Sequence, residues 1–162
     1  MSNTKKICIS GVTMAMYIAI MYVTQGFAFM AWQIRIATAL YSLSYLFPFL
    51  VVPLALANML SNIVMGGLGI FDIAGGLAVG IITTGAVYLV RRFNLPMVLV
   101  IPVLILGPGL VVPIWLSYLL NLPYLALVAS VSIGQVTPAV VGYFLIKILK
   151  KHMKGLKLNE QP

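Results

Sequence analysis

One apolar stretch, IATALYSLSYLFPFLVVPLALANMLSNIVM at residues 36–65, decides the fold of this chain. A membrane-spanning α-helix needs about 20 apolar residues, so the stretch is too long for one upright span and too short for two full ones. Pro48 and Pro53 interrupt it, and a proline inside a helix removes a hydrogen bond and kinks the backbone. The stretch is therefore either one kinked helix or two short helices, near 36–47 and 49–66.

The positions of the basic residues decide between these two alternatives. Lys and Arg collect in the cytoplasmic loops of membrane proteins. With the N-terminus inside and six crossings, all ten Lys and Arg residues except Arg35 lie on the inner side. One kinked helix would give five crossings and would leave the C-terminal lysines outside. We therefore predict an all-α membrane protein with six transmembrane helices and with both termini in the cytoplasm.

The remaining apolar blocks supply the other helices, and basic pairs or prolines mark their ends. Within the fifth helix, Leu106-Gly107-Pro108-Gly109 predicts flexible or broken backbone, which a membrane protein tolerates where protein or a cavity surrounds it. We expect one integral membrane domain over residues 1–162, ending in a basic cytoplasmic tail at 151–162. The expected helices lie near 7–29, 36–47, 49–66, 70–90, 95–120 and 123–150.

The composition excludes several classes of function. The chain is 62% hydrophobic and 7% charged, with a mean hydropathy of +1.12, whereas a soluble domain carries about 25% charged residues. The net charge of +8 lies at helix ends, where topology explains it and where it meets lipid headgroups, so we expect no nucleic-acid partner. With one His, one Cys and two acids, the chain cannot assemble a catalytic triad or a metal cluster within the membrane. We expect neither an enzyme nor a cofactor.

Polar and aromatic residues gather near the expected outer face. Taken singly, the aromatic residues fit an interfacial belt, the amides fit interhelical hydrogen bonds, and Arg35 with Asp72 fits a salt bridge between loops. Taken together, they resemble a small-molecule pocket, which has aromatic walls and a few orienting polar groups. The candidate binding residues are Trp32, Gln33, Arg35, Thr38, Asn58, Asp72, Trp115, Tyr124 and Gln135.

Small residues recur every four positions on one face of the first helix, in Gly11-Val-Thr-Met-Ala15-Met-Tyr-Ile-Ala19. Such a stripe lets another helix approach closely. The helix that approaches the stripe belongs either to the same bundle or to a partner subunit. Gly11, Ala15 and Ala19 are therefore the candidate partner interface.

These patterns resemble the substrate-binding S-components of energy-coupling factor (ECF) transporters, and within them the queuosine-precursor (QueT) family. The Ala-x-x-x-Ala stripe fits the wider group. The finer likeness runs in order along nearly the whole chain. It comprises Gln33-Ile-Arg35-Ile-Ala-Thr-Ala39-Leu40, Ala57-Asn58-Met-Leu-Ser, Gly67-Leu-Gly-Ile-Phe-Asp72-Ile, Leu122-Pro123-Tyr124 and Gly134-Gln135.

The resemblance implies a multi-pass subunit of the bacterial cell membrane that binds its ligand from outside, under the loops between helices. It then docks through its first helix on a transmembrane coupling subunit driven by two cytoplasmic ATPases. The implied ligand is a planar base, a queuosine precursor or related deazaguanine. The family pattern has acids where this chain has Thr38 and Gln135, which leaves the ligand open. The alternatives are a stand-alone facilitator or secondary carrier, and a membrane scaffold without a ligand.

Overall fold

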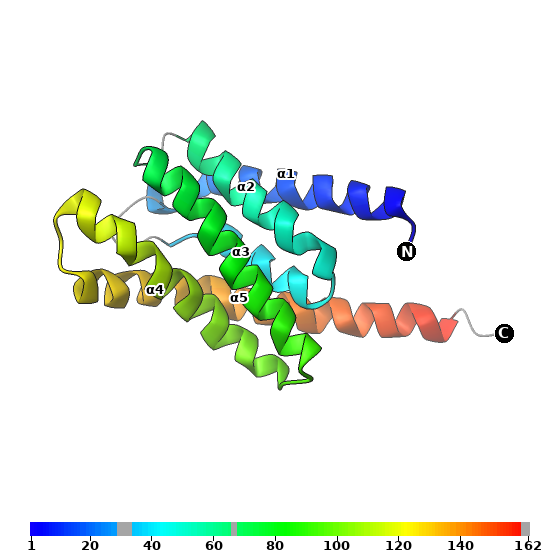
Figure 1. Cartoon of the computed structure of the whole chain (residues 1–162). Coiled ribbons are helices and arrows are strands. Elements are labelled where there is room, and N and C mark those ends of the chain that lie inside the picture. The colour runs from blue at the N-terminus through cyan, green and yellow to red at the C-terminus, as the bar shows by residue number, and fades with distance from the viewer. Residues whose placement is uncertain (29–33, 66–67, 160–162) are drawn as a thin grey trace.

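Every element in the described part of the chain is helical (Figure 1). The structure is a computed structural model of the 162-residue chain, and it describes residues 1–28, 34–65 and 68–159. The prediction of an all-α protein is confirmed for these residues. In chain order the elements are α1 (Asn3–Ala28), the 3₁₀-helices η1 (Ile36–Tyr45) and η2 (Pro48–Leu50), α2 (Val51–Val64), α3 (Ile70–Arg92), the 3₁₀-helix η3 (Met97–Leu99), α4 (Val100–Leu120) and α5 (Tyr124–Asn159).

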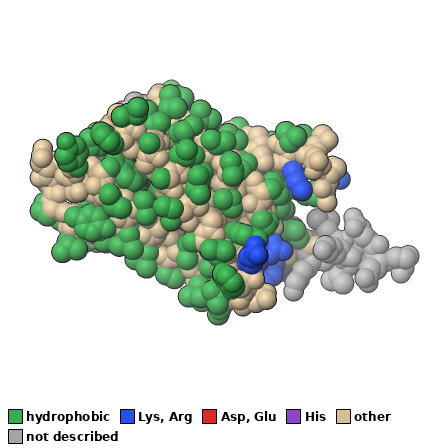
Figure 2. All heavy atoms as spheres, in the orientation of Figure 1, with side chains coloured by type: hydrophobic (Ala, Val, Ile, Leu, Met, Phe, Trp, Pro, Cys, Tyr) green, Lys and Arg blue, Asp and Glu red, His purple; other side chains and the backbone are tan. Residues whose placement is uncertain are grey.

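Four of the helices are long and apolar enough to cross a membrane. They are Asn3–Gly26, Ile70–Arg92, Met97–Leu120 and Tyr124–Met153, and Pro48–Val64 is a shorter apolar helix. Hydrophobic side chains are spread over most of the face seen in Figure 2. Those with the highest exposure, such as Val23 at 81% and Leu125 at 77%, would be costly in water and suit a lipid surface. The chain is therefore a membrane protein, and the number of crossings stays a prediction.

The stretch at residues 36–65 divides at Leu46 and Phe47. Its first part, η1, is a ten-residue 3₁₀-helix rather than an α-helix. A 3₁₀-helix rises about 2.0 Å per residue instead of 1.5 Å, so η1 reaches roughly 20 Å where an α-helix would reach roughly 15 Å. Its second part, Pro48–Val64, reaches roughly 25 Å at the α-helical rise. Of the two segments, η1 therefore extends further than an α-helix of the same residue count would.

The packing around η1 explains how so long a 3₁₀-helix is held. Eight of its ten residues are buried. Its neighbours approach closely at glycines: a Cβ on Gly142 of α5 would lie 2.9 Å from the Ala39 carbonyl oxygen, and one on Gly80 of α3 would lie 3.4 Å from Tyr41 Oη. The Ser44 hydroxyl lies 2.7 Å from the Tyr41 carbonyl and 2.9 Å from the Thr84 carbonyl of α3. The element is thus supported from several sides by contacts that only small residues permit.

One expectation from the sequence was wrong. The backbone at Leu106-Gly107-Pro108-Gly109 is not broken, because α4 runs through it as one helix. The glycines serve packing instead: a Cβ on Gly107 would lie 2.5 Å from Thr83 Oγ1, and one on Gly109 would overlap Ser132 Oγ. Residues 151–159, expected in the basic tail, continue α5 as helix, and the cytoplasmic position of this tail stays a prediction. Lysine is a good helix former, so a basic segment does not by itself end a helix.

The start of α1 and the end of α5 lie at one end of the bundle, and the ends of α2 and α4 with the start of α3 lie at the other (Figure 1). Lys and Arg side chains in view gather at the end with the termini (Figure 2). Asp72 and Arg91, near opposite ends of α3, are separated by roughly 28 Å along the helix axis, close to the thickness of a hydrocarbon core.

Reporter labelling in cells should place both termini in the cytoplasm. A tag fused after Pro162 should react with a membrane-impermeant reagent only after lysis, because six crossings return the chain to its starting side. A tag at the N-terminus is the matched control and should behave alike. Labelling of the C-terminal tag in intact cells would indicate an odd number of crossings and would contradict two spans within residues 36–65.

Candidate ligand-binding site

Four of the predicted site residues meet at the end of the bundle away from the termini. Arg35 precedes η1, Asn58 lies on α2, Asp72 lies in the first turn of α3, and Trp115 lies on α4. Arg35 Nη1 donates a hydrogen bond to Asn58 Oδ1 at 3.0 Å, and Arg35 Nη2 lies 4.0 Å from Asp72 Oδ2. Trp115 Nε1 donates to Asp72 Oδ1 at 3.2 Å. Residues far apart in the sequence thus form one polar cluster, which we call the Arg35–Asp72 cluster and which includes Asn62.

Two amides of α2 hold the start of α3 in place. Asn58 Nδ2 donates to the Gly76 carbonyl at 2.9 Å, and Asn62 Nδ2 donates to the Asp72 carbonyl at 2.8 Å. The two asparagines are four residues apart, so they lie on the same face of their helix. Gly76 makes the close approach possible, because a Cβ there would lie 2.7 Å from Asn62 Nδ2. Side chains of α2 therefore hold the backbone at Asp72 in place, and with it the position of the Asp72 carboxyl group.

The indole of Trp115 has its position set in the same way. A Cβ on Gly75 would lie 2.6 to 2.8 Å from three atoms of the indole ring. The glycine therefore lets the ring lie directly on α3, with its N–H turned to Asp72. A larger residue at position 75 would displace the ring and break that hydrogen bond.

The buried charges of the cluster contribute little to the stability of the fold and are better explained by a role in binding. Arg35 is 6% exposed and Asp72 is 1% exposed. Removing two charges from water costs several kcal/mol for each ion. The attraction between Arg35 and Asp72 at 4.0 Å offsets only a part of this cost. The first turn of α3 does favour a carboxylate, because the helix dipole is positive there. A buried ion pair held this loosely has the properties of a functional site in a membrane protein.

Two acceptor oxygens of the cluster have no hydrogen-bond donor within the described part of the chain. They are Asp72 Oδ2 and Asn62 Oδ1, and both are buried. Buried acceptors normally receive a hydrogen bond, and leaving one without a donor costs about 1–3 kcal/mol. Because Asn62 also holds the Asp72 backbone, the two oxygens belong to one site. The cluster can therefore accept hydrogen bonds from the donors of a bound molecule.

Among the other predicted site residues, Thr38 follows Arg35 closely, and its backbone N–H donates to the Arg35 carbonyl at 2.9 Å. Thr38 on η1 and Gln135 on α5 are buried polar residues. Tyr124 is 39% exposed, and its hydroxyl donates to the Leu110 carbonyl of α4 at 2.9 Å, so it joins two helices at the surface. Trp32 and Gln33 lie outside the described residues.

The sequence analysis did not select Asn62 as a binding residue, nor Gly75 and Gly76 as residues that position the cluster. The spacing Asn58-x-x-x-Asn62 could have indicated the first of these, because it places two amides on one face of α2. The two glycines carried no such signal, since glycine is common in spanning helices.

The predicted partner interface lies on the outer face of α1. Gly11, Ala15 and Ala19 are exposed, and a Cβ on Gly11 would meet no atom within 4 Å. Thr13 and Tyr17 face the bundle and are buried. The two sets differ by two positions, or roughly 200° around the helix, so the stripe points away from the protein's own helices. Within the described residues, packing inside the bundle does not account for it.

Comparison with known families identifies the chain. The sequence model of the family described as QueT transporter matches residues 7–151, and this range contains every residue of the Arg35–Asp72 cluster and of the α1 stripe. Comparisons with curated proteins and with solved structures gave no match. The match confirms the resemblance seen in the sequence motifs. The chain is a member of the QueT transporter family.

Proposed function

We propose that this chain is the substrate-binding S-component of an ATP-driven ECF-type uptake transporter, and that its ligand is a queuosine precursor or a related deazaguanine. The observation that carries the proposal is the Arg35–Asp72 cluster, a buried polar site in a protein of a transporter family. Its residues come from four separate segments that meet at the end opposite the basic residues. That end faces outward under the positive-inside rule, so the ligand enters from outside.

The chemistry of the cluster favours a planar base with several N–H donors. A deazaguanine presents ring N–H and amino donors along one edge, and carboxylate and amide oxygens accept such bonds well. Asp72 Oδ2 and Asn62 Oδ1 are acceptors of this kind. Trp115 supplies an aromatic ring bonded to the same carboxylate. Thr38 and Gln135 replace acids of the family pattern, so fewer negative charges face the ligand and a neutral ring suits the site best.

In an ECF transporter, ligand binding and ATP hydrolysis belong to different subunits, and the chain fits the binding subunit. The sequence contains no phosphate-binding loop, so we assign ATP hydrolysis to other subunits. The stripe of Gly11, Ala15 and Ala19 offers a helix of the coupling subunit a flat surface for close approach. Two cytoplasmic ATPases would then drive the coupling subunit, and the S-component would tilt until its site faces inward.

Isothermal calorimetry tests the ligand. The purified chain should bind at least one compound from a panel of deazaguanine bases, queuine and queuosine, and guanine serves as the matched control for the ring. Guanine presents the same N–H donors on its edge, so it tests the contacts with Asp72 and Asn62. A difference in affinity between guanine and the deazaguanines then measures the contribution of the modified ring. If the whole panel fails while an unrelated vitamin binds tightly, the substrate proposal is wrong and membership in the transporter family is unaffected.

Reconstitution tests the mode of transport. Vesicles that contain the chain with the coupling subunit and both ATPases should accumulate the bound ligand only when ATP is present. Vesicles with the chain alone should bind the ligand without accumulating or equilibrating it. Equilibration by the chain alone would identify a stand-alone facilitator, and accumulation driven by an ion gradient would identify a secondary carrier.

A further inference from the structure

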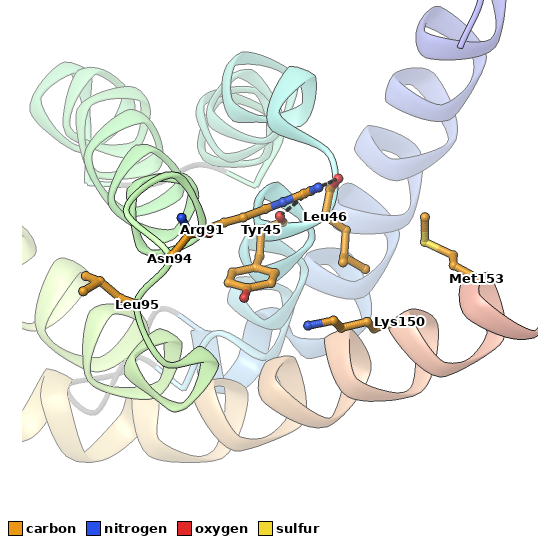
Figure 3. Close-up of a pocket in the computed structure, with 7 residues that line it drawn as sticks. All are labelled: Tyr45, Leu46, Arg91, Asn94, Leu95, Lys150 and Met153. Atoms are coloured by element: carbon orange, nitrogen blue, oxygen red, sulfur yellow. Dashed lines mark hydrogen bonds between the residues drawn. The ribbon is translucent and has the colours of Figure 1, made fainter. Parts of the chain in front are cut away.

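A cavity lies at the basic end of the bundle, away from the Arg35–Asp72 cluster. Its volume is about 400 Å³, within the range of small-molecule sites. Figure 3 shows Arg91 of α3 and Lys150 of α5 reaching toward the space beside Tyr45, where η1 ends. The Asn94 amide also lines the cavity, next to the end of α3. Two cations therefore line one partly open cavity.

The position of Arg91 is set by the fold. Its Nη1 donates to the Tyr45 carbonyl at 2.9 Å and to the Leu46 carbonyl at 2.7 Å. These carbonyls lie at the end of η1, where a 3₁₀-helix leaves acceptors without partners in its own backbone. The guanidinium is thus held in place before anything binds, and a planar guanidinium loses little further freedom for each added bond. Lys150 is exposed and brings a mobile ammonium to the same cavity.

The protein supplies no negative charge to balance this cavity within its described part. The whole sequence has two acids, Asp72 and Glu160, and Asp72 is committed to the cluster near the other end of α3. Arg92, Lys147 and Lys151 add further positive charge nearby along α3 and α5. Cations gathered without acids attract an anion from the surroundings. The cavity is therefore electrostatically suited to an anionic ligand from outside the chain.

The walls of the cavity indicate which kind of anion it takes. Leu46, Leu95 and Met153 provide apolar surface beside the basic groups. α3 ends at Arg92, so the cavity lies at the level where apolar helix gives way to polar headgroups. Basic pockets between helices at this depth suit phospholipid headgroups. We propose that this cavity binds the phosphate of an anionic phospholipid, with Arg91 and Lys150 as its charged contacts and with the apolar wall against the start of the acyl chains.

Lipid retention measured by native mass spectrometry tests the proposal. The full chain is reconstituted in phosphatidylcholine vesicles that contain or lack phosphatidylglycerol, and the phosphatidylglycerol kept after extraction is counted. Lys150→Gln should lower the apparent affinity for phosphatidylglycerol about fivefold, the effect of one basic residue at a membrane surface. Lys151→Gln removes the same charge from the adjacent residue, which does not line the cavity, and should leave retention unchanged. Leu95→Trp should lower retention by filling the cavity without changing charge.

The outcomes separate the sources of the anion. If Lys150→Gln and Leu95→Trp reduce retention while Lys151→Gln does not, the cavity is a lipid site. If phosphatidylglycerol has no effect while inorganic phosphate raises the Tm of the wild type but not of Lys150→Gln, the site takes a free anion and the lipid proposal is overturned. Equal losses for Lys150→Gln and Lys151→Gln would indicate general surface charge and would also overturn it. The lipid proposal would also be overturned if Lys150→Gln changed only the association with another subunit and left lipid retention unchanged.

Discussion

Replacing Ala15 and Ala19 together with leucine should abolish uptake and coupling-subunit association while ligand binding stays intact. Both residues lie on the outer face of α1, and Thr13 and Tyr17 on the opposite face carry its packing in the bundle. Two leucines would therefore separate a docking helix from α1 without disturbing the protein's own core. The measurements are ATP-dependent uptake, co-purification of the coupling subunit, and calorimetry of the variant alone.

A matched control comes from α3. Gly85→Leu adds a large side chain at another helix position where an added Cβ meets no atom within 4 Å. This variant should keep uptake, because its site makes no proposed contact with a partner. Normal assembly and uptake by the α1 double variant would remove the stripe from the partner interface, whatever the ligand proves to be.

Neutralising Asp72 should weaken ligand binding roughly 5- to 150-fold, with Asp72→Ala at the upper end. The range follows from about 1–3 kcal/mol for leaving a buried hydrogen-bonding partner without its counterpart. Asp72→Asn keeps an acceptor for Trp115 Nε1 and removes only the charge, so it should lose less. The measurement is calorimetry against the compound that binds in the deazaguanine panel.

Loss of stability must be separated from loss of binding in this experiment. Removing one member of a buried ion pair destabilises a protein, so the Tm of each Asp72 variant is measured without ligand. Glu160→Gln removes the chain's other acid and is the matched charge control, which should bind normally. The site assignment fails if Asp72→Ala, folded by its Tm, binds as tightly as the wild type. Gln135→Ala should fall in the same range, and it tests whether α5 reaches the ligand.

The features that follow from composition and spacing could be predicted, because they depend on local chemistry. The all-helical class followed from apolar length, and the grouping of Arg35, Asn58 and Asp72 followed from polar residues near the ends of expected helices. Tyr124 was placed in the same group, and its role in binding stays a prediction, because its hydroxyl donates to the Leu110 carbonyl of α4. Spacing along the chain gives the level of a residue in the bundle and not the direction in which it points.

Close packing between helices could not be predicted from one sequence. Gly107 and Gly109 indicated broken backbone, yet each gives room to a side chain of a neighbouring helix, Thr83 and Ser132. Glycine serves both purposes, and only the neighbour decides between them. The 3₁₀ form of η1 was hidden for a similar reason, because the carbonyls at its end, of Tyr45 and Leu46, accept hydrogen bonds from Arg91, which is distant in the sequence. Tertiary contacts select that form, and local propensity does not reveal it.

The threefold repeat of η1 makes it a three-sided column, since residues three apart lie directly above one another. One side, with Tyr41 and Ser44, meets α3, and another, with Ala39 and Ser42, meets α5. Inserting or deleting a single residue would turn everything beyond it by a third of a turn and present each side to the wrong neighbour. Substitutions of similar size within one side leave that order intact. The length of this segment is therefore constrained more tightly than its composition, and exchanges between related chains should preserve the residue count from Ile36 to Tyr45.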